Sequence, residues 1–252
     1  MAGPLPNVVE EGRRVLALAE AQGVTLRLVG GVAVFLRAPN GLPEPFRRTY
    51  QDLDFAAARG SSAACRMLFG RLGYEPQVRF NALHGSERLL FFDQGNGRKV
   101  DVFVGAFRMS HRIPLDARLG LEPLTVPLAE LLLTKLQIAE LNEKDVRDTL
   151  ALLHDHGIGD EDGESVNGAR LAEVLSDDWG LWRTFTGNLA ACREHLPRYG
   201  LGAEETRRVE ERMDALGERI EAAPKSRAWK LLARIGERKR WYELPEEVDD
   251  GL

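Results

Sequence analysis

Two short apolar runs constrain the fold of this chain most, because each carries aspartate where a buried strand would carry an aliphatic residue. They are residues 50–55, YQDLDF, and residues 99–103, KVDVF. Alternate side chains of a strand point to the same face, so Asp52 and Asp54 are expected side by side while the residues between them enter a core. Asp101 stands in the second run. Like charges on one face need an offset, and carboxylate oxygens suit a divalent cation, Mg²⁺ or Mn²⁺.

The composition is that of an ordinary water-soluble chain. Its 252 residues allow one large domain or two small ones, and 44% hydrophobic residues are enough for a core. No run approaches the roughly 18 apolar residues of a membrane helix, and no secretory signal is recognisable. Cys65 and Cys192 are expected as free thiols, which favours the cytoplasm. The net charge of −5 argues against constitutive binding of long nucleic acid, although a local basic patch stays possible.

The first half of the chain alternates between helix and strand patterns and then turns to strands. Hydrophobic periodicity predicts helices over 8–22, 32–37 and 61–72, and strands over 25–29, 52–57, 77–83, 88–92 and 98–104. The DQGNG sequence at 93–97 predicts a hairpin between the last two strands. We therefore expect an α/β (α+β) fold with a mixed sheet flanked by helices.

After Pro123 the pattern becomes helical. We predict helices over 127–141 and from the Asn142 cap to about residue 156, a Gly- and Asp-rich linker over 157–167, and three or four helices over 169–242. The acidic tail after Leu244 is expected to fray. This divides the chain into an α/β domain over residues 1–124 and a helical domain over 125–252.

The order of these pieces resembles the nucleotidyltransferase fold. A helix, a strand, the Gly30-Gly31 turn and a second helix precede the Asp-x-Asp strand, and one more aspartate follows on a later strand. The closer resemblance is to the abortive-infection and toxin–antitoxin-associated nucleotidyltransferases of bacteria. Members of that group carry an arginine four residues before the acidic pair, here Arg48, and a later helix with a lysine, here Lys135. A Lys-Asp-x-x-Asp pattern follows at 144–148, and the match spans residues 8–155.

The resemblance implies a metal-dependent transfer of a nucleoside monophosphate from a nucleoside triphosphate to RNA, a protein or a small molecule. A toxin-like role, with an antitoxin partner, comes with the same resemblance. The acids that it implies for catalysis and for binding Mg²⁺ or Mn²⁺ are Asp52, Asp54 and Asp101. The residues expected at the nucleotide are Gly30, Gly31, Arg48 and Lys135. The two glycines open a helix N-terminus, whose N–H groups and dipole favour phosphate.

Two positions depart from the family pattern. Gly31 stands where many members have a serine that contacts phosphate, so backbone N–H groups are the donors left there. Tyr50 stands two residues before the first acid, where threonine or serine is common. Both departures imply altered nucleotide selectivity. They also favour a second hypothesis, in which the chain is a catalytically silent nucleotide-binding or interaction module.

Each singled-out residue also has a structural explanation. Gly30-Gly31 can be an ordinary turn, the acidic pair a solvated strand surface, Lys135 a helix-surface lysine and Arg48 a member of a surface ion pair. The acids at 144–148 can simply stabilise the first turn of a helix.

The segment Lys225–Tyr242 is the strongest candidate for an RNA surface, including one for tRNA. Its basic residues are interleaved with aromatic ones, a combination that binds phosphates and stacks bases. The alternative is an amphipathic helix whose Trp229, Leu232 and Ile235 side packs inward while its basic side is solvated.

Overall fold

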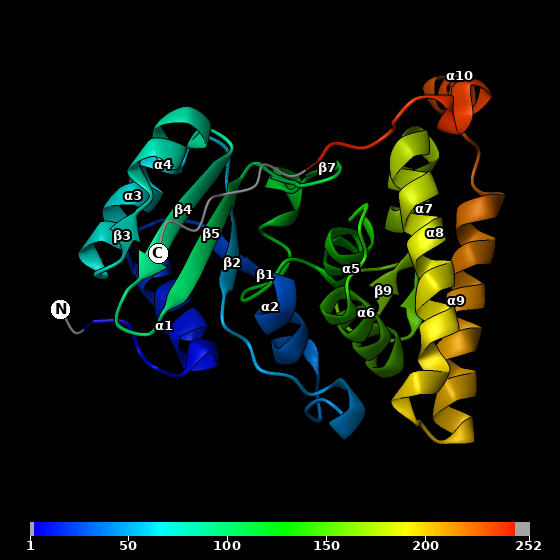
Figure 1. Ribbon diagram of the computed structural model, residues 1–252, viewed down its shortest axis with the longest axis horizontal. Helices are drawn as coiled ribbons and strands as arrows, with labels where there is room; N and C mark the ends of the chain where they lie inside the picture. Colours follow the sequence, from blue (N-terminus) through cyan, green and yellow to red (C-terminus); the bar gives the residue numbers. More distant parts are fainter. Residues whose placement is uncertain (1–2, 245–252) are drawn as a thin grey trace.

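A five-stranded mixed sheet forms one end of the molecule (Figure 1). The computed structural model describes residues 3–244, and the acidic tail after Leu244 lies outside them. The strand order is β1-β2-β5-β4-β3. β2 and β5 run parallel, and the other neighbours pair antiparallel. The strands are β1 (Leu26–Val29), β2 (Leu53–Ala57), β3 (Glu75–Pro76), β4 (Arg88–Asp93) and β5 (Arg98–Val104).

The two faces of the sheet differ in chemistry, as strand alternation requires. One face is apolar and packs against α1 (Val8–Ala21) and α3 (Ser62–Arg71). The Phe69 ring of α3 stacks on Phe91 with centroids 4.7 Å apart and also contacts Phe55. The opposite face carries the aspartates and turns toward α2 (Gly30–Arg37) and the helices that follow the sheet.

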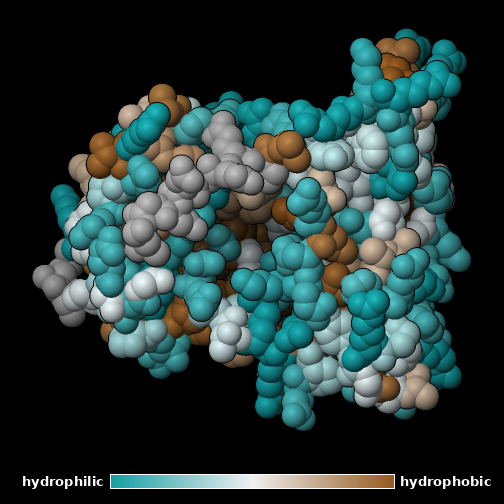
Figure 2. Space-filling model, viewed as in Figure 1, coloured by the Kyte–Doolittle hydropathy of each residue, from teal (hydrophilic) through white to brown (hydrophobic). Residues whose placement is uncertain are grey.

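The helical part extends away from this second face. α5 (Leu128–Leu136) and α6 (Glu143–Asp155) lie nearest the sheet, and α7 (Gly168–Asp177), α8 (Trp179–His195) and α9 (Ala203–Ala222) form the far end (Figure 1). After α10 (Arg227–Ile235) the chain runs back toward a small hairpin of β6 (Ala106–Arg108) and β7 (Arg112–Pro114). Hydrophilic residues cover most of the surface in view, and hydrophobic ones lie deep in a hollow between the two ends (Figure 2).

The sheet and the helical part share one buried core. Residues from α1 to α9 belong to a single hydrophobic cluster. The chain on either side of the expected 124/125 boundary also pairs with β1, since Leu28 donates to Leu124 at 2.9 Å and accepts from Val126 at 3.1 Å. The division into residues 1–124 and 125–252 therefore stays a prediction.

The fold class predicted from the sequence is confirmed: a mixed α/β sheet is flanked by helices and followed by a helical region. The hairpin around 93–97 joins β4 and β5 as expected. Cys65 and Cys192 are free and buried. Within residues 3–244, no helix combines the length and the hydropathy that a membrane span requires.

Three segments differ from their predictions. Residues 77–83 form a helix, α4 (Val78–His84), instead of a strand. The predicted 157–167 linker contains a short parallel pair, β8 (Ile158–Gly159) with β9 (Val166–Asn167), and the helix expected over 127–141 ends at Leu136.

The side chains of two polar residues explain why α4 is a helix. Gln77 caps its N-terminus by accepting from the Phe80 N–H. Asn81 binds the backbone of Leu90 on β4 twice: its amide donates to the carbonyl at 2.9 Å and accepts from the N–H at 2.7 Å. A side chain thus supplies the pairing that a strand backbone would have given, and the apolar Val78 and Leu83 remain exposed.

Replacing Asn81 by Ala should destabilise the fold, because the buried Leu90 N–H would lose its acceptor. An unsatisfied buried donor costs about 1–3 kcal/mol in the free energy of unfolding. Asn81→Asp should also destabilise the fold, because an oxygen would replace the buried NH2 that donates to the Leu90 carbonyl. Chemical denaturation measures both, with Arg79→Ala on the exposed side of α4 as the control. An Asn81→Ala variant as stable as this control would show that the two hydrogen bonds between Asn81 and the Leu90 backbone do not contribute to stability.

Candidate active site

The three aspartates lie on one face of the sheet. β2 and β5 pair in parallel register with Asp54 beside Asp101. Residues opposite each other in adjacent strands point to the same side. Asp52 directly precedes β2 and stands two residues before Asp54, so it belongs to that side too. The apolar residues that alternate with Asp52 and Asp54, namely Leu53 and Phe55, are fully buried on the other face, as predicted.

The Gly30-Gly31 turn places the N-terminus of α2 against this acidic face. Gly30 has a φ of +70°, a conformation that L side chains rarely adopt. A Cβ at Gly30 would overlap the carboxylate of Asp54, and a Cβ at Gly31 would overlap the guanidinium of Arg48. Glycine at 30 is favoured by its positive φ as well as by this contact, and any side chain at 31 would have to displace the end of the Arg48 side chain. A serine at 31, the family's usual residue, would collide with Arg48 as it lies here.

A buried ion-pair network holds the two predicted cations. Arg48 donates two hydrogen bonds to Asp148, at 2.9 and 2.7 Å. Lys135 contacts Asp148 at 2.8 Å and Asp145 at 3.0 Å. Lys135 is buried, so its reading as a helix-surface lysine is wrong. Although burial alone would raise the pKa of Asp148, Lys135 and Arg48 lower that pKa overall.

Asp145 and Asp148 are the residues that sequence reasoning undervalued. They were assigned to the first turn of a helix, and the Asn142 side chain does cap that turn by accepting from the Asp145 N–H at 3.1 Å. Both carboxylates nevertheless point at Lys135, and Asp148 has a side-chain exposure of only 1%. The sequence signal for a shared role of these two acids is their spacing, because residues three apart lie on the same side of a helix.

The acidic pair perturbs the pKa of Asp54. Burial, followed by the neighbouring charge of Asp101, raises the pKa of Asp54 to about 7, against the opposing effect of Lys135. Asp54 therefore exchanges a proton near neutral pH. A poised carboxyl group of this kind is typical of functional sites.

Asp101 is held by cations on its other side. Its carboxylate contacts Arg88 at 2.7 Å and Lys99 at 3.6 Å. Within residues 3–244, acids, histidines and cysteines form no group of three that could hold a metal ion as arranged. The three aspartates fit Mg²⁺ or Mn²⁺ in ligand type and in strand register, and a metal shared by all three would require Asp101 to turn away from Arg88.

A cavity of about 210 Å³ brings most of the predicted residues together. Gly31, Arg48, Asp52, Asp54 and Lys135 all line it, and Gly30 adjoins Asp54 behind them. The remaining lining residues are mainly polar and come from α2, from the loop before β2 and from the start of α6: Val32, Thr49, Tyr50, Gln51, Asn142, Lys144 and Asp145. Asp101 lies next to this group in the sheet without lining the cavity.

Tyr50 adds an unpaired polar atom to the same cavity. Its ring lies under the Arg48 guanidinium at 4.4 Å, and its buried hydroxyl has no hydrogen-bond partner within the described residues. Burial, together with the charge of Asp148, raises the pKa of Tyr50 to about 12, so the hydroxyl keeps its proton. It is therefore a buried donor without a partner on a residue that lines the cavity.

The basic segment Lys225–Tyr242 begins at the far end of the molecule with α10 and then returns toward the β6–β7 hairpin (Figure 1). Its Trp229 contacts Trp182 of α8 at 5.2 Å, and Trp241 contacts Trp179 at 5.9 Å and donates to Thr184 at 3.0 Å. Both tryptophans are thus engaged with α8. The inward packing expected of Leu232 and Ile235 is not found, since they are 44% and 39% exposed.

Comparison with known proteins gives a distant structural likeness. No family model matches the chain, and no curated protein matches it. A solved structure that resembles it is the lincomycin-bound lincosamide antibiotic adenylyltransferase LnuA, with 18% sequence identity and a TM-score of 0.41. The likeness covers 58% of this chain and 97% of that chain. It is too distant to carry that protein's activity or ligand over to this chain.

Replacing Gly30 by Ala should cost more stability than replacing Gly41 by Ala. Both glycines have a positive φ, and a Cβ at Gly41 would meet open space. Gly41→Ala should thus cost about 1–2 kcal/mol for the backbone strain alone. Gly30→Ala must also displace the Asp54 carboxylate, which adds about 1–3 kcal/mol. Chemical denaturation of the pair measures the difference, and equal losses would mean that Asp54 moves aside freely.

Proposed function

We propose that this chain is a nucleotidyltransferase that transfers a nucleoside monophosphate from a nucleoside triphosphate to an acceptor hydroxyl. The observation that carries the proposal is the strand register that sets Asp54 beside Asp101 on the face where α2 begins. Acids in a row beside a helix N-terminus and two cations form a site that can hold a triphosphate and take up a proton.

The cavity supplies the phosphate contacts. Arg48, Lys135 and Lys144 bring positive charge to its walls. The ordered ion pairs with Asp148 fix Arg48 and Lys135 in place before any ligand binds. At about 210 Å³ the cavity is smaller than the roughly 300–1,000 Å³ of most ligand sites. We assign it to the triphosphate end and leave the nucleoside outside.

The acids would bind metal and accept the proton. Mg²⁺ or Mn²⁺, held by Asp52, Asp54 and Asp101, would neutralise the charge of the phosphates. Burial and the charge of Asp101 raise the pKa of Asp54 to about 7 without metal, so this carboxyl group takes up a proton more readily than an ordinary aspartate. In the family that the sequence resembles, Asp101 has this role, and the two carboxyl groups lie side by side.

Two other readings have less support. A toxin-like role on tRNA, with an antitoxin partner, would use Lys225–Tyr242, whose tryptophans are already packed on α8. A silent module would be consistent with the missing hydroxyl at Gly31. It gives no physical reason for three acids on one face or for the raised pKa of Asp54.

The first test measures turnover. The chain is incubated with each labelled nucleoside triphosphate, Mg²⁺, and in turn total tRNA, cell protein or the small-molecule fraction of a cell extract. We expect pyrophosphate release that depends on the metal and is lost in Asp54→Asn. Metal-dependent nucleotide binding without release from any mixture would instead support the silent module.

A second test measures how the free energy of unfolding depends on pH. The folded chain keeps the Asp54 proton up to about pH 7, whereas the unfolded chain releases it near its ordinary pKa of 3.8. The free energy of unfolding should therefore fall as the pH rises from about 4 to 7. Asp54→Asn should remove this fall and be more stable than the natural chain at pH 8, by about 1–3 kcal/mol.

Denaturation in EDTA-containing buffers at several pH values makes this measurement. Glu173→Gln serves as the control, because its side chain is 72% exposed and pairs only at the surface. A loss of stability in Asp54→Asn at pH 8 would contradict the proposal and mark Asp54 as a structural acid.

A further inference from the structure

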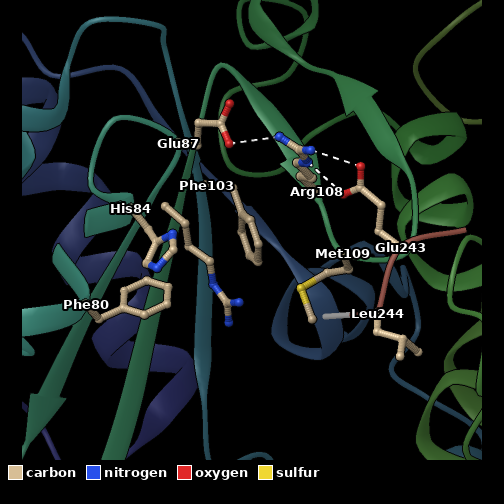
Figure 3. A pocket seen from close by; sticks show the side chains of 9 residues that line it. Phe80, His84, Glu87, Phe103, Arg108, Met109, Glu243 and Leu244 are labelled. Atoms are coloured by element: carbon tan, nitrogen blue, oxygen red, sulfur yellow. Dashed lines mark hydrogen bonds and ion pairs between the residues drawn. The ribbon is translucent and has the colours of Figure 1, made fainter. Parts of the chain in front are cut away.

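A second cavity, also of about 210 Å³, opens on the acidic face beside β4 and β5. Figure 3 shows Phe80 and His84 of α4 on one side, Met109 and Leu244 on the other, and Phe103 between them. The returning C-terminal segment forms one lip of the cavity. The Glu243 N–H donates to the Ser110 carbonyl at 2.9 Å, which fixes this lip against the β6–β7 hairpin.

Asp101 lies between the two cavities. On one side it adjoins Asp54, which lines the first cavity. On the other side it binds Arg88 at 2.7 Å, and the Arg88 side chain lines the second. Phe103, two residues along β5, shares the face of Asp101 and forms the second cavity's wall. Asp101 itself lines neither cavity, but its neighbours Asp54 and Arg88 each line one, so the row Asp54–Asp101–Arg88 connects the two.

The interior of the second cavity suits a ring. The Arg88 guanidinium lies over Phe103 at 5.2 Å and over Phe80 at 5.6 Å, which gives a flat, partly apolar wall. Met109 and Leu244 line the opposite side (Figure 3). A space of about 210 Å³ holds one ring of a ligand and leaves the rest outside.

The rim carries more negative than positive charge. Arg108 binds Glu87 at 3.1 Å and Glu243 at 2.9 Å, and these two glutamates are 62% and 57% exposed. Both lining arginines are therefore already paired with carboxylates. Because Glu87 and Glu243 stay exposed at the rim, an RNA backbone would meet solvent-facing carboxylates there, which repel phosphate. A neutral ligand, or one with an amine near the rim, would meet no such repulsion.

We propose that this second cavity is the acceptor site and that the acceptor is a small alcohol with a ring, either uncharged or carrying an amine. This rests on the proposed function. The acceptor oxygen forms a bond to the α-phosphorus, and the bond from that phosphorus to the oxygen bridging to the β-phosphate breaks. Pyrophosphate leaves with the bonding electrons, and the hydroxyl proton passes to a carboxylate of the Asp54–Asp101 pair.

Binding is tested separately from transfer. The full chain is labelled with ¹³C at its methionine methyl groups and titrated with three probes: 2-amino-1-phenylethanol, 2-phenylethanol and mandelate. We expect the Met109 signal to shift most with the amine and least with the carboxylate. Met67 and Met213 do not line the cavity and act as internal references. An unmoved Met109 signal, or one that responds most to mandelate, would overturn the proposal.

Two variants locate the effect. Met109→Trp fills the cavity, so binding of the amine should disappear. Because this variant has no Met109 signal, binding is followed through the NMR signals of the ligand. Phe80→Ala removes one wall and should weaken the Met109 response. Leu83→Trp, which adds the same bulk on an exposed position of α4 outside the cavity, should leave binding unchanged. Equal binding in all three variants would place the ligand elsewhere.

Transfer is then followed with labelled triphosphates. In the natural chain and in Leu83→Trp, label should enter the small-molecule fraction of a cell extract. Met109→Trp should lose this labelling while it still binds the nucleotide. Label on RNA that Met109→Trp leaves intact would overturn the small-molecule acceptor. Probe binding without transfer to any fraction would refute the proposed function and the acceptor role, and it would leave a ring-binding site.

Discussion

Asp54 and Asp101 stand side by side on parallel strands, where two carboxylates repel each other in surroundings that solvate them poorly. The sheet allows neither to leave, because shifting the register by one residue would drive Leu53 and Phe55 out of the core. The neighbouring elements supply the compensation. Arg88 and Lys99 hold Asp101, and the glycine turn brings the positive end of α2 to Asp54. A metal would complete this balance.

Asp148 organises the other wall of the site. It joins Arg48, from the loop before β2, to Lys135, from α5, although it lies on α6 itself. Buried ion pairs often add little net stability, because removing charges from water costs about as much as their attraction returns. The benefit here is positional: three separate elements hold two cations at one cavity. This is the preorganisation that charge stabilisation in an active site requires.

Local patterns predicted the parts of the molecule that local forces decide. Alternation gave the side to which Asp52, Asp54 and Asp101 point, and the turn residues gave the β4–β5 hairpin. The contact of Arg48 with Asp148 spans 100 residues, and no periodicity reveals it. Residues 77–83 were misread because one side chain, Asn81, substitutes for a strand's backbone pairing. The close approach of Arg48 to Gly31 also has no sequence signal, and a serine there would have to displace the end of that side chain.

The backbone contacts of Leu28 with Leu124 and Val126 have a consequence for how the chain holds together. β1 is an edge strand, and the stretch leading into α5 shields part of that edge. Unshielded edges recruit other chains and promote aggregation. The stretch 124–126 therefore protects this edge, and a sheet fragment that ends before it would be prone to self-association.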